Sequence, residues 1–78
     1  MITNGDGFHA SVALAEQIKR ARHKAKLSQD ELAALAGISR RPIYLLESGR
    51  GAIRLDTLIQ ILDALGLALH IQPKGPKP

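Results

Sequence analysis

The sequence predicts an all-α fold of four helices, followed by one short β-strand that pairs across a homodimer. Apolar residues recur at helical spacing in four segments, at about residues 11–26, 29–36, 40–48 and 55–65. The two central segments are separated by only three residues, one of them glycine. A single segment near the C-terminus alternates apolar and polar residues, the period of a strand.

The first ten residues, MITNGDGFHA, show no apolar period and hold two glycines, so we expect a flexible arm. The helix expected at 11–26 has a narrow apolar stripe formed by Leu14, Ile18, Ala21 and Ala25. Its stretch KRARHKAK holds five of the 11 basic residues of the chain. A membrane-seeking face would need a broader apolar side with Trp or Phe. We therefore interpret the basic face as one that flanks a DNA phosphate path.

Residues 28–49 predict two short helices joined by a tight turn. Ser28 and Glu31 have the S-x-x-E spacing of a capping box, which begins a helix. Gly37 ends that helix, because glycine adopts the left-handed backbone conformation at least cost. Ser39 is placed to cap the second helix. Two helices joined so closely must cross steeply, which is helix-turn-helix geometry.

The segment LALHIQ at 67–72, directly after the last helix (55–65), is the strand candidate. A lone strand cannot satisfy its backbone hydrogen-bonding groups, so its expected partner is the same strand of a second copy about a two-fold axis. The residues expected at this dimer interface are Leu67, Ala68, Leu69, His70 and Ile71. The alternative is an apolar coil that covers the core. Residues 73–78 are expected to form a mobile tail.

The composition favours an anionic partner and argues against several classes of protein. The chain carries 11 Lys and Arg against 7 Asp and Glu, a formal net charge of +4. No stretch approaches the ~20 apolar residues of a membrane span, and the N-terminus lacks signal-peptide features, so we expect a cytoplasmic, nucleoid-associated protein. Cysteine is absent, the three histidines are far apart, and no phosphate-cradling glycine loop is present. We therefore expect no enzyme, no cofactor and no metal site.

The second central helix is the expected reader of double-stranded DNA. Such a helix fits the major groove, where each base pair presents a distinct pattern of donors and acceptors. Arg40 and Arg41 lie at its start, and one arginine can bridge O6 and N7 of guanine, worth about 1–3 kcal/mol of discrimination. Gln29 and Arg50 are placed for phosphate oxygens, and Leu45 for a thymine methyl group. The candidate DNA-contacting residues are Ser28, Gln29, Ser39, Arg40, Arg41, Tyr44, Leu45 and Arg50.

The pattern SQ-x-ELA-x-x-AGIS-x-x-x-IY-x-LESG resembles the lambda-repressor-like (Xre, or Cro-type) helix-turn-helix family over residues 14–66. The longer run from Gly37 to Gly75 is similar to HipB-like antitoxins, in which a strand follows the last helix directly. This resemblance implies a homodimeric repressor that binds a palindromic operator, autoregulates its operon and binds a HipA-like serine/threonine kinase toxin. It also implies a structural ion pair between Glu47 and an arginine of the first helix, here Arg22.

Pro42 departs from the family pattern, which usually has a polar residue in the first turn of this helix. Proline removes a donor and biases Arg41 away from helical angles, so we expect an altered aim of the two arginines. Two alternatives to the antitoxin stay open. One is a phage-type or stand-alone Xre regulator without a toxin, and the other is a protein-interaction module, indicated by the apolar Leu35 and Leu45.

Overall fold

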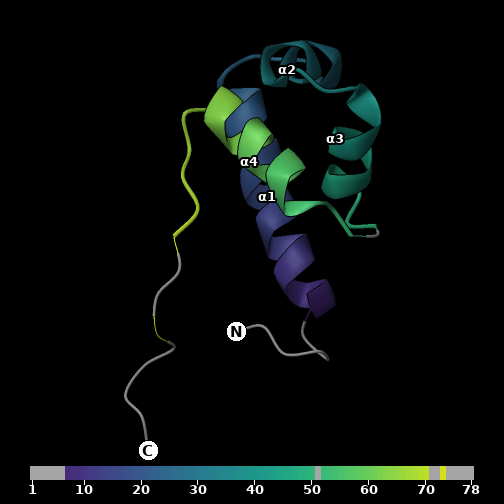
Figure 1. Ribbon diagram of the computed structural model, residues 1–78, viewed down its shortest axis with the longest axis vertical. Coiled ribbons are helices and arrows are strands. Elements are labelled where there is room, and N and C mark those ends of the chain that lie inside the picture. Colours follow the sequence, from purple (N-terminus) through teal and green to yellow (C-terminus); the bar gives the residue numbers. More distant parts are fainter. Residues whose placement is uncertain (1–6, 51, 71–72, 74–78) are drawn as a thin grey trace, which may run out of the picture.

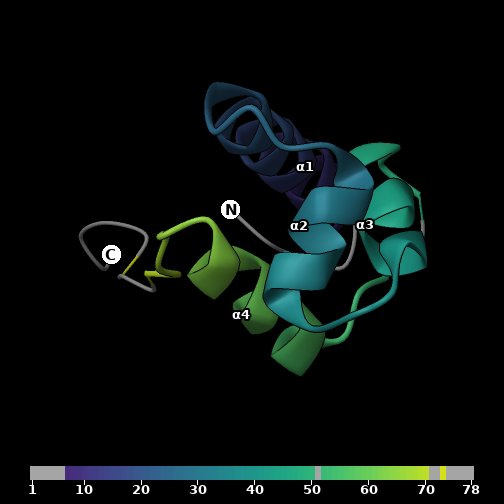
Figure 2. The same cartoon turned by 90° about the horizontal axis from the view of Figure 1, so that it is seen from above.

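The computed structural model describes residues 7–50, 52–70 and 73, and this part of the chain contains four helices and no strand. The helices are α1 (Gly7–Lys24), α2 (Gln29–Ala36), α3 (Arg40–Glu47) and α4 (Leu55–Ala64). Helix α1 runs along the domain, with α2 across its upper end and α3 on one side (Figure 1). Seen from above, α2 lies between α3 and α4 (Figure 2). No helix in these ranges is long and apolar enough to cross a bilayer.

The core forms where one face of each helix meets the others. Its four fully buried large side chains come from different helices and are Ile18, Leu32, Ile43 and Ile61. Burying each of them contributes about 1.5–3 kcal/mol relative to leaving it exposed. Ala33, also buried, lies on the face of α2 that contributes to the core with α3 and α4. The apolar side of α3 is therefore anchored, and the polar side is left at the surface.

The bounds of α1 differ from the predicted 11–26. The helix begins at Gly7, where the sequence shows no apolar period, and it ends at Lys24. Lys26 takes a left-handed conformation with φ 60°. Its N–H donates to the carbonyl of His23 (2.9 Å), and the N–H of Leu27 donates to that of Arg22 (3.1 Å). These two bonds form a Schellman motif, which ends the helix without the glycine that would have indicated it.

The capping box of α2 is formed as predicted. The Ser28 hydroxyl accepts from the Glu31 N–H at 2.9 Å, and the Ser28 N–H donates to the Glu31 carboxylate at 2.7 Å. Gly37 follows α2 with φ 74°. Ser39 occupies the N-cap position of α3, but its side chain makes no capping hydrogen bond, so that expectation was wrong. The third helical position, which normally supplies a donor to the cap, is Pro42, which has no N–H.

Residues 67–70 belong to no helix or strand, and they border an open groove of about 360 Å³ between α1 and the end of α4. Leu67 and Leu69 are 38% and 42% exposed. Residues 71 and 72 of the predicted strand lie outside the described residues. Because the expected hydrogen-bonding partner is a second copy of the chain, pairing across a dimer stays a prediction.

Candidate DNA interface

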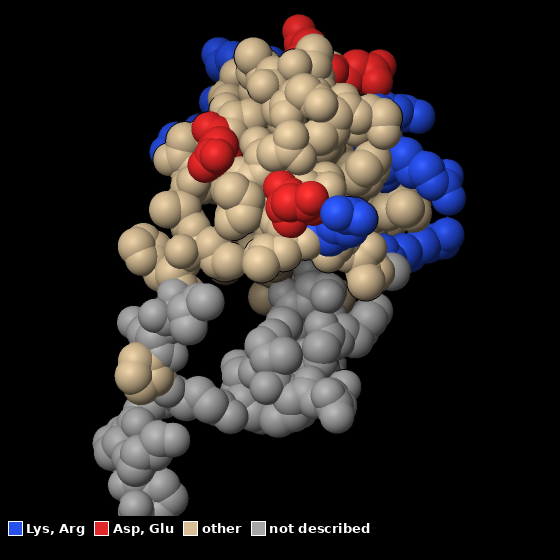
Figure 3. Space-filling model, viewed as in Figure 1, with Lys and Arg blue, Asp and Glu red and all other residues tan. Residues whose placement is uncertain are grey.

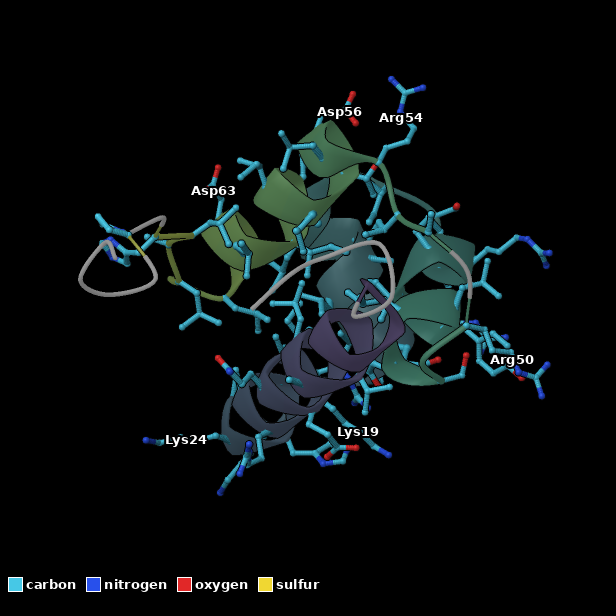
Figure 4. All side chains as sticks on the ribbon, turned by 90° about the horizontal axis from the view of Figure 1, so that it is seen from below. Lys19, Lys24, Arg50, Arg54, Asp56 and Asp63 are labelled. Atoms are coloured by element: carbon cyan, nitrogen blue, oxygen red, sulfur yellow. The ribbon has the colours of Figure 1, made fainter. Side chains whose placement is uncertain are left out.

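Positive charge gathers on the side of the domain formed by α1 and α3. In the space-filling view Lys and Arg crowd the edge next to α3, whereas the face over α2 and α4 shows Asp and Glu side chains scattered among uncharged ones (Figure 3). Lys19, Lys24 and Arg50 lie on the α1 and α3 side, and Asp56 and Asp63 of α4 point the other way (Figure 4). Apart from Arg54, which directly precedes α4, the exposed lysines and arginines of α1, α3 and the adjoining loops are Lys19, Arg20, Lys24, Lys26, Arg40, Arg41 and Arg50.

The structure brings Arg22 and Glu47 together beneath this surface. The guanidinium donates from Nε to Oε2 at 2.7 Å and from Nη2 to Oε1 at 2.8 Å. The two side chains are 9% and 4% exposed. A third donor of the same guanidinium, Nη1, reaches the carbonyl of Leu27 at 2.7 Å. One arginine thereby joins α1, the loop after it and the last turn of α3.

Both partners of this pair are charged at neutral pH. Burial raises the pKa of Glu47, but hydrogen bonds from Arg22 and Gln29 lower it more, so the pKa lies below the ordinary 4.5. The hydrogen bond to Glu47 raises the pKa of Arg22, although burial opposes it. The pair therefore acts as a fixed clamp between helices, and it is not exposed for a DNA contact.

Two of the predicted DNA-contacting side chains, Ser28 and Gln29, already make hydrogen bonds within the chain. The amide Nε2 of Gln29 donates to Oε1 of Glu47 at 3.1 Å, and the hydroxyl of Ser28 belongs to the capping box. The groups at this helix terminus that suit a phosphate oxygen are the backbone N–H groups of Gln29 and Asp30 in the first turn of α2, aided by the helix dipole. The side chain of Gln29 is therefore held in place by Glu47, and its hydrogen bond in turn stabilises the charged form of that carboxylate.

The first turn of α3 projects the candidate base-reading side chains. Arg40 and Arg41 are exposed, and Tyr44, one turn later, is 47% exposed. The Nε of Arg40 lies 3.6 Å from Oδ1 of Asp30 in α2. Sequence reasoning did not single out Asp30. Its only signal is an acid in the first turn of one helix and an arginine in the first turn of the next, and their contact depends on how the helices cross.

An open groove of about 290 Å³ separates α3 from the start of α4. Its apolar floor includes Leu45 and Ile53, and its rim carries Arg41, Arg50 and Arg54. Arg54 is held by Asp56 through bonds of 3.1 and 3.2 Å. Of the three arginines that line this groove, Arg41 and Arg50 are therefore the two that we expect to contact a DNA strand. The combination of apolar floor and cationic rim suits the deoxyribose and phosphate groups of a DNA strand.

Within the described ranges, no cluster of acids and histidines is able to hold a metal ion.

These features define a helix-turn-helix domain. Residues 18–71 match the family model described as Helix-turn-helix (HTH_3). The chain belongs to this family, whose Xre-like members are DNA-binding transcription regulators.

Relatives carry the same description. The chain is 33% identical over 60 residues to y4mF, an uncharacterized HTH-type transcriptional regulator of Sinorhizobium fredii. The aligned region covers 77% of this chain and 79% of that protein. It is 34% identical over 62 residues to an uncharacterized HTH-type transcriptional regulator of Haemophilus influenzae, across 80% of this chain and 63% of that one.

Solved structures confirm the four-helix fold and the likeness to HipB-type antitoxins. A chain of the HipA-HipB-O2-O3 complex superposes with a TM-score of 0.75 at 28% identity, over 83% of this chain and 92% of that one. A chain of a toxin-antitoxin module from Streptococcus pneumoniae gives a TM-score of 0.76 at 26% identity, over 96% and 85%.

Proposed function

We propose that this protein is a homodimeric, operator-binding repressor that serves as the antitoxin of a HipBA-type module. The observation that carries the DNA-binding part is the exposed first turn of α3, which begins with the two exposed arginines Arg40 and Arg41. Ile43 and Leu46 fix the opposite side of this helix in the core. The helix is thus rigidly mounted with its arginines outward, as major-groove recognition requires.

Groups around α3 supply the phosphate contacts in this proposal. Arg50 lies three residues after the end of α3, and it lines the groove between α3 and α4 together with Arg41. The Ser39 hydroxyl makes no cap, so it is available to a phosphate oxygen together with backbone N–H groups of the first turn. Such contacts fix the register of the helix on the duplex, while base contacts give the sequence preference.

A dimer is part of the proposal because one copy offers few base contacts. Two recognition helices about 34 Å apart read the two halves of a palindrome. The half-exposed Leu67 and Leu69 and the groove beside them supply an apolar surface for a second copy. Strand pairing between the two C-terminal segments would join the copies about a two-fold axis.

The antitoxin role, with operon autoregulation and a HipA-like kinase as partner, is supported by the similarity to chains of the HipA-HipB complex and of the pneumococcal toxin-antitoxin module. The relatives described only as HTH-type transcriptional regulators favour a second candidate, a stand-alone regulator without a toxin. Co-expression with the adjacent reading frame separates the two. We expect a kinase to copurify, and its absence from a pull-down in the native host would favour the stand-alone regulator.

The DNA-binding role is tested by replacing Arg40 and Arg41 with alanine. Because each guanine contact is worth about 1–3 kcal/mol, the double variant should lose at least ~10-fold in operator affinity at about 150 mM salt, measured by fluorescence anisotropy. Circular dichroism should show an intact fold. The matched control, Arg20→Ala with Lys24→Ala, removes equal charge from α1 and should weaken specific and non-specific binding alike. Unchanged operator affinity of the α3 variant would refute the role of that helix.

A further inference from the structure

We propose that Asp30 is a positioning residue that orients Arg40 toward guanine and so sets the base preference at one position of each half-site. This inference rests on the proposed function. It starts from the contact between the two first turns, where Oδ1 of Asp30 lies 3.6 Å from Nε of Arg40. Both side chains stay open to solvent, at 81% and 58% exposure.

The atom that Asp30 approaches decides which edge of the guanidinium remains available. Nε belongs to the side edge of the planar fork, and the terminal edge carries an N–H of each Nη. With a carboxylate at the side edge, Arg40 can still offer the terminal edge to O6 and N7 of guanine, the bidentate contact that distinguishes this base. Asp30 thus favours the approach of Arg40 through its terminal edge over the approach through its side edge.

The charge of Asp30 also selects between base and backbone. If Arg40 turned to a phosphate, its carboxylate partner would lie beside that phosphate, and like charges repel. A guanine edge is neutral and carries no such penalty. Among the residues that the structure describes, no carboxylate forms an ion pair with the neighbouring Arg41, which lines the groove with Arg50. The two adjacent arginines therefore have different environments, and base reading falls to Arg40.

Asp30 is held on a rigid element, as a positioning residue must be. It lies between Gln29, which is bonded to Glu47, and Glu31, which closes the capping box. The α2 and α3 helices pack against one another across the turn that follows α2. An exposed ion pair of this kind contributes little to stability, so a substitution can test positioning without unfolding the domain.

The test first selects operator sequences from random DNA with the wild-type protein, and then compares Asp30→Asn on every single-base variant. We expect the variant to lose about 2- to 5-fold of its preference for guanine at one position per half-site, which is what orientation by an exposed ion pair supplies. Affinity for non-specific DNA should stay equal or rise, because a negative charge is removed. Replacing that guanine by 7-deazaguanine, which lacks N7, should weaken the wild type more than the variant.

Two matched variants separate positioning from charge. Asp63→Asn makes the same charge change on α4, away from the basic side (Figure 4), and should keep the guanine preference. Asp30→Glu retains a carboxylate and should keep part of the guanine preference that Asp30→Asn loses. If Asp30→Asn keeps the wild-type preference, or changes affinity for all sequences equally, the inference is overturned while the proposed function stands. If the wild type selects no sequence, both fall.

Discussion

The carboxylate of Glu47 accepts two hydrogen bonds from the guanidinium of Arg22, at 2.7 and 2.8 Å, although the residues are 25 positions apart. The contact fixes the last turn of α3 to α1. Replacing a buried ion pair by apolar residues is often neutral, but removing one partner leaves a charge buried and unpaired. The importance of the pair for stability is therefore clearest in single substitutions.

Glu47→Gln should lower the free energy of unfolding by about 3–5 kcal/mol, because the Arg22 charge stays buried without its counter-ion. Domains of this size have only about 4–12 kcal/mol in total, so much of that stability would be lost. Urea unfolding followed by circular dichroism at neutral pH measures the change. Asp56→Asn, which breaks the exposed pair with Arg54, should leave the midpoint nearly unchanged. An equal, small effect of both substitutions would contradict a structural role for the buried pair.

The same pair predicts how stability depends on pH. The pKa of Glu47 is lower in the folded chain than its ordinary 4.5. The unfolded chain therefore binds this proton first as the pH falls, and the stabilisation by Glu47 is complete above about pH 4.5 and lost progressively below it. Urea midpoints measured between neutral pH and about pH 3 should show this loss, and the gap between wild type and Glu47→Gln should narrow. A gap that stays constant over this range would show that the carboxylate does not titrate with folding.

Features set by short spacings were predictable from the sequence, and those set by helix crossing were not. The S-x-x-E box and Gly37 fixed the ends of α2, and the pair of Arg22 and Glu47 followed from a family pattern. The missing cap at Ser39 depends on the proline three residues later, a conflict between two local rules. The contacts of Asp30 and Gln29 join different helices, so only the fold shows them.

Lys26 predicts a stabilising substitution. Its left-handed φ of 60° costs a residue with a Cβ roughly 1 kcal/mol, and glycine carries no such cost. Lys26→Gly should therefore raise the free energy of unfolding by up to about 1 kcal/mol, seen as a higher midpoint in urea. Arg20→Gly, an exposed position inside α1, should lower it by a similar amount. If both variants were less stable than the wild type, the left-handed conformation of Lys26 would not be a source of strain that lowers the stability of the domain.

The proposed dimer is tested at Leu69. This side chain is 42% exposed beside the groove between α1 and α4. Leu69→Asp would place a charge in the apolar surface offered to a second copy, where burying it unpaired is costly. Sedimentation at micromolar concentration should show a dimer for the wild type and a monomer for the variant, with operator binding weakened because one copy reads only half a palindrome. The control is Leu35→Asp on α2, where the leucine is 63% exposed, and it should stay dimeric. A monomeric wild type, or dissociation caused by Leu35→Asp alone, would place any assembly elsewhere than on the C-terminal segment.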